Sequence, residues 1–261
     1  MQDLATLVRA HEDIYRSFTE LVRDLDDADW HRPTGCPGWD VADQVAHVAS
    51  LEALLAGDPY PDDHALAGDT AHVRDDVGRF MEVLVDVRRG RSREEVVAEL
   101  EGAVARRRSQ LAAHTDVAED GPSFRGGTEP LYRSLPIRVV DLYAHEQDVR
   151  RAVGRSGHTS GPAPAIVVER FAKGLAAVLP TKLGRPGVVR FELTDDPARS
   201  FQVALDGADA EGDPTVRIPV TVEQFVAIGA GRADAPRATA LDVEGDGALA
   251  AIVLPACGLT P

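Results

Sequence analysis

The sequence contains little cysteine and no long apolar run. Cys36 and Cys257 are the only cysteines of the 261-residue chain and lie far apart. They therefore indicate neither a disulfide framework nor a metal site built on thiolates. A membrane span needs about 18 or more consecutive apolar residues, and no such run is present. The N-terminus also lacks the basic region and apolar stretch of a secretory signal, so we expect a cytoplasmic protein.

Positive charge is scarce as well. The chain has 28 Lys and Arg residues against 43 Asp and Glu residues, a formal net charge of −15. Such a surface repels phosphate backbones and anionic lipid headgroups, so we expect neither nucleic acid nor membrane as a partner. Hydrophobic residues make up 44% of the chain, enough for a core in each of two domains. The sequence leaves the oligomeric state open.

The first half of the chain has the apolar periodicity of helices. Leucine, valine and aromatic residues recur every three or four positions, separated by loops rich in glycine and proline. Ser92 followed by Glu95 is typical of a capping box at a helix start. The pattern predicts an up-and-down helical bundle over residues 1–155. Its helices are expected at residues 4–25, 41–55, 70–89, 92–111 and 134–153.

After a linker rich in glycine, serine and proline at residues 154–164, the pattern changes. Short runs of β-branched residues alternate with helical segments, which predicts a small α+β domain over residues 163–261 built on an antiparallel sheet. We expect strands at residues 188–193, 200–205, 215–219 and 240–243, and helices at residues 165–178, 221–228 and 245–254. The fold class is therefore α+β, a helical bundle followed by a small mixed domain.

Three residues form a candidate metal site. Asp141 and His145 stand four residues apart on one face of a predicted helix, and His47 flanks the apolar stripe of another. Helical bundles build metal sites from inward residues of facing helices, and two imidazoles with one carboxylate suit zinc. Nickel, iron and manganese also accept this donor set. Spacing alone equally fits a surface pair of Asp141 with His145 and a packing histidine at His47.

Other residues have plainer interpretations. Cys36 lies in a tight Pro-Gly turn and is expected to pack structurally. Trp30 and Trp39 are expected to anchor the loop to the bundle rather than to form a stacking site. His11 lies on an apolar stripe and is expected in the core, whereas the remaining histidines are expected to be solvated: His31, His64, His72, His114 and His158. Asp148 could orient the His145 ring or pair with Arg151 or Arg138.

Two motifs resemble the mycothiol-dependent maleylpyruvate isomerase family, an actinobacterial type of enzyme within the DinB-like metal-binding bundle superfamily. The first runs from Trp30 to Val41, WHRPTGCPGWDV, and continues to His47. The second runs from Asp141 to Arg150, DLYAHEQDVR. The segments AGR at Ala230–Arg232 and VEGDGALA at Val243–Ala250 resemble the family's C-terminal domain, an α/β module related to sterol-carrier-protein-like folds. The resemblance thus covers nearly the whole chain.

The resemblance implies that His47, Asp141 and His145 hold a divalent metal. The family typically has Glu where this chain has Asp141, which leaves the original isomerase substrate in doubt. The resemblance also implies mycothiol or a similar low-molecular-weight thiol as cosubstrate and a small electrophile as substrate. A metal-bound thiol ionises readily and becomes a nucleophile. Isomerisation and thiol S-transfer both remain open.

Arg232 is expected to hold a substrate carboxylate through bidentate hydrogen bonds. The competing interpretation of Arg232 is a solvated loop arginine. Two other functions also remain open for the whole chain. One is a metal-dependent hydrolase whose open site holds water, and the other is a non-catalytic module that binds a metal or ligand.

Overall fold

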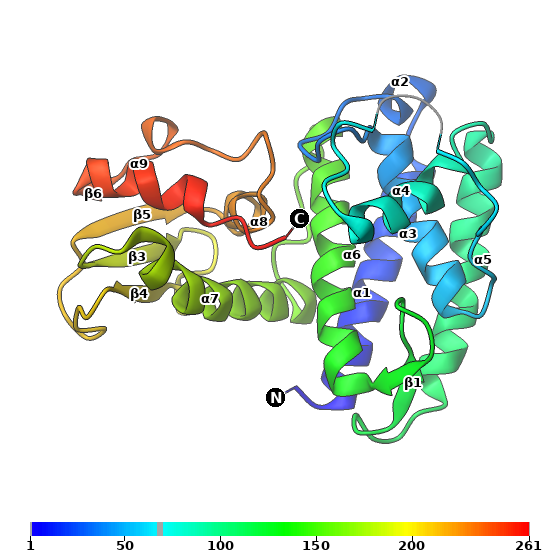
Figure 1. The fold of residues 1–261 in the computed structure, drawn as a ribbon, viewed down its shortest axis with the longest axis horizontal. Coiled ribbons are helices and arrows are strands. Elements are labelled where there is room, and N and C mark those ends of the chain that lie inside the picture. The colour runs from blue at the N-terminus through cyan, green and yellow to red at the C-terminus, as the bar shows by residue number, and fades with distance from the viewer. Residues whose placement is uncertain (1, 67–69, 261) are drawn as a thin grey trace. The chain divides into compact units, whose positions relative to one another are not determined.

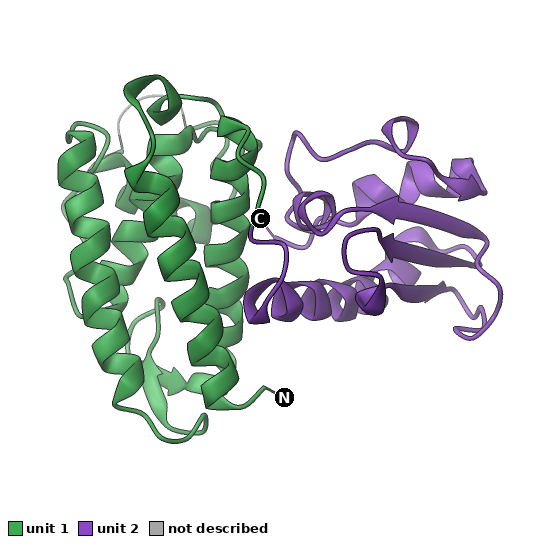
Figure 2. Ribbon diagram, turned by 180° about the vertical axis from the view of Figure 1, so that it is seen from behind, with its two compact units in different colours: residues 1–157 green, residues 158–261 purple. Residues whose placement is uncertain are grey.

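The computed structural model describes residues 2–66 and 70–260. The chain divides into two compact units, residues 1–157 and 158–261 (Figure 2). The first is a helical bundle with one small hairpin, and the second combines helices with a four-stranded sheet. Among the described residues, no helix has both the length and the apolar character that a membrane crossing requires.

Four long helices form the first unit (Figure 1). They are α1 (Leu4–Arg23), α3 (Val41–Leu55), α5 (Arg93–Ala112) and α6 (Leu131–Val153). Helix α3 packs against α5 and α6, and α1 packs against α5 and α6. The apolar stripe of α1 faces this core, where Leu7, Ile14 and Phe18 are at most 2% exposed. Because α3 and α6 are neighbours, residues far apart in the sequence meet between them.

The start of α3 is set by a capping box. The Asp40 carboxylate accepts from the backbone N–H of Asp43, and the Asp43 carboxylate accepts from that of Asp40. This begins the helix directly after the turn at residues 33–39 and places His47 two turns into it. The short helix α2 (Asp27–Trp30) precedes the turn. The sequence therefore ties the position of His47 to the turn before it.

The third helix is shorter than predicted. The expected helix over residues 70–89 is wrong at both ends, because α4 spans Asp76–Asp86. The Asp75 carboxylate caps it by accepting from the Gly78 N–H at 2.8 Å, and residues 70–75 form turns and bends. The glycine-rich connection after α5 contains a hairpin of β1 (Asp120–Pro122) and β2 (Thr128–Pro130).

The sheet of the second unit has the strand order β4-β3-β5-β6. These strands are β3 (Gly187–Leu193), β4 (Phe201–Leu205), β5 (Val216–Val220) and β6 (Glu244–Gly245). The helices are α7 (Pro162–Leu183), α8 (Val222–Gly229) and α9 (Gly247–Ala256), with 3-10 turns η1 (Pro197–Arg199) and η2 (Ala238–Ala240). Phe171, Phe191, Phe201 and Phe225 form an aromatic cluster that joins α7 and α8 to the sheet.

Two expectations about this sheet are wrong. The sheet is mixed rather than antiparallel, because β3 pairs with β5 in parallel, Val189 opposite Val216. The alternating pattern shows which face of a strand is buried but carries no information on the direction of its neighbour. The strand expected at residues 240–243 is also absent, since a 3-10 turn ends at Ala240 and the edge strand is Glu244–Gly245. A Cβ at Gly245 would lie 2.5 Å from the Thr215 carbonyl oxygen, so this close pairing needs glycine.

Candidate metal centre

Helices α3 and α6 bring His47, Asp141 and His145 together. One donor atom from each residue can be chosen so that all three lie within 4.8 Å of one another. His47 Nε2 lies 3.3 Å from Asp141 Oδ2, and His145 Nε2 lies 3.5 Å from Asp141 Oδ1. Asp141 and His145 share a face of α6, and His47 reaches them from α3. The contact between the two helices therefore gathers two imidazoles around one carboxylate.

These separations fit a small divalent cation. Zinc binds imidazole nitrogen and carboxylate oxygen at about 2.0–2.2 Å, so two ligands of a tetrahedral ion lie roughly 3.3–3.6 Å apart. Each imidazole lies in this range from one of the two Asp141 oxygens, His47 from Oδ2 and His145 from Oδ1. The donor set, two nitrogens and one oxygen, also matches what zinc and its neighbours accept. Three protein ligands would leave a further coordination position for water or substrate.

Of the three candidate ligands, Asp141 is the most exposed to solvent. The side chains of His47 and His145 are 2% and 8% exposed, whereas that of Asp141 is 31% exposed. Burial lowers the pKa of His47 to about 4, so its imidazole is neutral near pH 7. Burial opposes ionisation of Asp141, but the charge of Arg138 offsets it and holds the pKa of this carboxyl well below its usual range. Both groups are thus in the protonation state that binds a cation.

Arg138 holds Asp141 from the bundle interior. Its Nη1 contacts Asp141 Oδ2, and its Nε donates to Oε1 of Glu52 at 2.6 Å. Glu52 is fully buried and also accepts from Arg107 at 3.1 Å and from the Tyr15 hydroxyl at 2.7 Å. A buried network of compensating charges therefore positions the exposed carboxylate. Asp141 Oδ2 therefore contacts both Arg138 and His47.

The two candidate ligand imidazoles are oriented in different ways. His145 Nδ1 bonds to the Gln44 side-chain oxygen, and Asp148 Oδ2 lies 3.5 Å from the same nitrogen. Asp148 also pairs with Arg151 at 2.6 Å, whereas Arg138, the third partner considered from the sequence, pairs with Glu52 and Asp141. Within the described residues, His47 Nδ1 has no hydrogen-bond partner. The His47 ring is instead held by packing.

Trp39 supplies that packing. Its ring centroid lies 5.0 Å from that of His47 and 5.8 Å from that of His145. Its indole N–H donates to Glu82 of α4 at 2.8 Å, and Glu82 is 1% exposed. The same carboxylate oxygen binds His72 at 2.8 Å. Trp39 is therefore more than the loop anchor expected from the sequence, because it forms a wall of the site.

Several histidine interpretations change. His72 is largely shielded from solvent, with its side chain 16% exposed and bonded to the buried Glu82 carboxylate at 2.8 Å. His64 keeps a side chain that is 31% exposed but pairs with Asp86 at 2.7 Å. Both partner carboxylates lie on α4. Glu82 follows His72 by 10 residues and Asp86 follows His64 by 22 residues, spacings that no helix or strand periodicity reveals. His11 is fully buried as expected, with Nδ1 bonded to the Leu7 carbonyl at 2.8 Å.

Arg232 lies in the second unit. It follows α8, its side chain is 7% exposed, and its Nη1 donates to the Ala230 carbonyl at 3.1 Å. It is therefore not a solvated loop arginine. Its contact with a substrate carboxylate stays a prediction.

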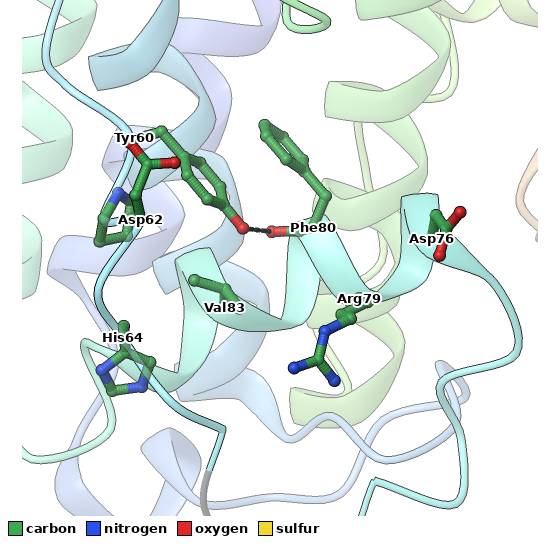
Figure 3. Close-up of a pocket in the computed structure, with 8 residues that line it drawn as sticks. Tyr60, Asp62, His64, Asp76, Arg79, Phe80 and Val83 are labelled. Carbon is green, nitrogen blue, oxygen red and sulfur yellow. Dashed lines mark hydrogen bonds between the residues drawn. The ribbon is translucent and has the colours of Figure 1, made fainter.

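A separate hollow lies on the first unit, away from the three candidate ligands. It is lined by Tyr60, Pro61, Asp62, His64, Asp76, Arg79, Phe80 and Val83 (Figure 3). The Tyr60 and Phe80 rings stack with centroids 4.4 Å apart, and the Tyr60 hydroxyl donates to the Phe80 carbonyl. Neither His47, Asp141 nor His145 contributes to its lining.

Sequence reasoning missed three supporting residues of the centre. Gln44 precedes His47 by three residues on α3, Glu82 lies on α4, and Arg138 precedes Asp141 by three residues on α6. The spacings of Gln44 and Arg138 from the ligands are helical and are the signal that could have found them. Glu82 has no such signal, because its link to the site passes through the Trp39 ring.

Comparison with known proteins identifies the family of this chain and structures that share its fold. A family model described as "Mycothiol maleylpyruvate isomerase N-terminal domain" matches residues 11–150, more than half of the chain. Crystal structures of the mycothiol-dependent maleylpyruvate isomerase and of a single-site mutant of it share the fold. They show TM-scores of 0.57 and identities of 17% and 16%, and the alignments cover 90% of this chain and 92% of theirs. A search of curated sequences gives no match. The chain belongs to the mycothiol maleylpyruvate isomerase N-terminal domain family.

Proposed function

We propose that this chain is a divalent-metal-dependent enzyme that adds the sulfur of mycothiol, or of a similar low-molecular-weight thiol, to a small electrophile. The observation that carries the proposal is the convergence of His47, Asp141 and His145 donor atoms within 4.8 Å at a partly open carboxylate. Zinc suits this donor set best, and nickel, iron and manganese also suit it. Membership of the family supports the thiol, since its name carries mycothiol.

The chain's own residues prepare the site. A divalent cation held by His47, Asp141 and His145 would favour ionisation of a thiol at neutral pH and so supply a nucleophile. His47 and His145 bind from the buried side, and the 31% exposed Asp141 marks the side from which thiol and electrophile enter. Trp39 covers both imidazoles with its ring and limits access of water to them. Arg138 keeps Asp141 ionised and fixes its direction.

Arg232 is our candidate for holding a carboxylate of the electrophile. A guanidinium binds a carboxylate with two parallel hydrogen bonds, which positions the substrate for attack. Arg232→Lys keeps the charge and loses that geometry. We expect a raised KM for anionic substrates, by about ten-fold or more, with unchanged metal content. Unchanged kinetics in Arg232→Lys and Arg232→Ala would remove Arg232 from the mechanism.

Thiol dependence tests the function directly. The zinc-loaded protein is incubated with panels of small electrophiles, maleylpyruvate and activated alkenes among them, with and without mycothiol or cysteine-based thiols. Product formation that requires both the thiol and the metal supports the proposal. If isomerisation consumes no thiol and conjugation consumes one equivalent, thiol titration separates isomerase from S-transferase.

The alternatives predict different results in the same assay. A metal-dependent hydrolase would turn over ester or amide substrates without thiol. A non-catalytic module would bind metal or ligand and form no product under any condition. Turnover that is independent of thiol would therefore contradict the proposal in favour of the hydrolase.

A further inference from the structure

A chain of hydrogen bonds connects the turn before α3 to His145. The Thr34 hydroxyl donates to the Trp39 carbonyl at 2.7 Å. Gln44 Nε2 donates to the Thr34 oxygen at 3.0 Å, and Gln44 Oε1 bonds to His145 Nδ1. Gln44 is fully buried and His145 is 6% exposed, so water does not compete freely for these groups.

The direction of every bond in this chain follows from its first member. A carbonyl oxygen only accepts, so the single hydroxyl proton of Thr34 is committed to Trp39. The Thr34 oxygen must then accept, which requires the NH₂ group of Gln44 to face it. The amide oxygen of Gln44 consequently faces His145, and because it only accepts, His145 Nδ1 must carry a proton.

We infer that Thr34 is a positioning residue that, through Gln44 and alongside the Asp148 carboxylate 3.5 Å from the same nitrogen, favours the Nδ1–H tautomer of His145. In that tautomer the proton is on Nδ1 and the lone pair is on Nε2, the atom that faces Asp141 at 3.5 Å. The opposite tautomer would instead donate from Nε2 to Asp141 and leave Nε2 without a lone pair for a cation. Thr34 and Gln44 therefore hold the imidazole ready to bind metal before any ion arrives.

The tautomer is directly measurable in the metal-free protein. Long-range ¹H–¹⁵N spectra of histidine-labelled protein at pH 8 distinguish Nδ1–H from Nε2–H, and His145→Gln assigns the signals. We expect wild-type His145 to be predominantly Nδ1–H. Thr34→Val removes the hydroxyl and should raise the Nε2–H share severalfold, whereas Thr34→Ser should match wild type. Gln44→Met, which lacks the acceptor, should give the same shift as Thr34→Val.

A second measurement separates tautomer selection from support of the turn. Gln44→Glu supplies a carboxylate whose two oxygens both accept, so it needs no hydroxyl to orient it. Thr34→Val should weaken zinc binding about ten-fold in the wild-type background, and less than two-fold in the Gln44→Glu background. Zinc affinity is measured by competition with a chromophoric chelator. A residue that only supports the turn would produce equal losses in both backgrounds.

The inference rests on the metal centre proposed above, and the two measurements fail differently. An unchanged tautomer ratio in Thr34→Val and in Gln44→Met overturns the inference and leaves the metal centre intact. Equal losses of zinc affinity in the two Gln44 backgrounds also overturn it. A wild-type protein that binds no metal but shows the shifted ratio in both variants retains the tautomer selection and contradicts the proposed function alone.

Discussion

Arg138 and Glu52 form a buried ion pair directly behind the candidate metal centre. Arg138 Nε lies 2.6 Å from Glu52 Oε1, with the two side chains 6% and 0% exposed. Burial opposes both charges, and each charge offsets that cost for the other, so the pKa of Glu52 stays below its usual value. Arg138 also contacts Asp141, and the pair therefore links the stability of the bundle to the position of a candidate ligand.

Removing one partner of this buried ion pair should destabilise the protein. Arg138→Met leaves Glu52 with Arg107 and Tyr15 and leaves Asp141 without its guanidinium. We expect the free energy of unfolding to fall by roughly 3 kcal/mol, as for other broken buried pairs. Urea denaturation measures it. The control is Arg106→Met, which breaks the exposed pair with Asp58 and should cost less than about 1 kcal/mol. Equal losses in the two variants would contradict the importance of the buried pair.

Acid should weaken the bundle through His11. Burial lowers the pKa of this imidazole from 6.5 to about 4, so between these pH values the unfolded chain binds a proton that the folded chain excludes. Stability is therefore complete above pH 6.5 and is lost as the pH falls towards 4. At pH 5 the loss from this residue is roughly 2 kcal/mol. The drop in unfolding free energy between pH 7.5 and 5 should be smaller by that amount in His11→Leu, and an identical drop would refute the assignment.

Trp39 should report occupation of the centre. Its ring centroid lies 5.0 Å from that of His47 and 5.8 Å from that of His145, close enough for a paramagnetic ion bound by them to quench its fluorescence. We expect cobalt to quench the emission of Trp30→Phe, which retains Trp39, in a saturable way. Trp39→Phe should lose most of the quenching, and His47→Ala should abolish saturation at stoichiometric cobalt. Saturable quenching of equal size in both tryptophan variants would place the ion elsewhere.

Gly38 is expected to be irreplaceable for the turn. Its φ is +80°, and a Cβ there would lie 2.4 Å from the His72 ring. Gly38→Ala should therefore lower the thermal stability by more than backbone strain alone would. It should also weaken zinc binding, because it displaces the turn that carries Thr34 and Trp39. Gly57→Ala is the control, since Gly57 has a φ of +105° and no atom within 4 Å of such a Cβ. Thermal unfolding and chelator competition compare the two, and equal effects would show that the contact with His72 has no role.

The convergence of the three candidate ligands could be predicted from the sequence to different degrees. Asp141 and His145 stand four residues apart, so the helix itself brings them together. The approach of His47 depends on the packing of α3 against α6, which local spacing does not encode; its place beside an apolar stripe and the family motif were the only signals for it. Thr34 and Gln44 could not be assigned a role, because hydroxyl and amide groups become specific only through partners brought near by the fold. Glu82 acts from a helix whose start was itself misplaced by six residues.

In the second unit, the positions of the strands were easier to predict than the way in which the strands pair. Val189, Phe191 and Leu193 alternate with less buried residues, and this period of two marks β3. The pairing of β3 with β5 in parallel depends on the course of residues 206–215, which carries no periodic signal. The edge strand at Glu244–Gly245 was missed because two residues are too short for a pattern.

The most direct test of the account is the metal content of the purified protein and of two variants. We predict one divalent ion per chain in wild type, measured by elemental analysis after exchange into metal-free buffer and reloading with zinc. His47→Ala and His145→Ala should each lose it while keeping the helical circular dichroism of wild type. A wild-type protein that retains no ion, or variants that bind it as tightly as wild type, would contradict a metal centre at His47, Asp141 and His145.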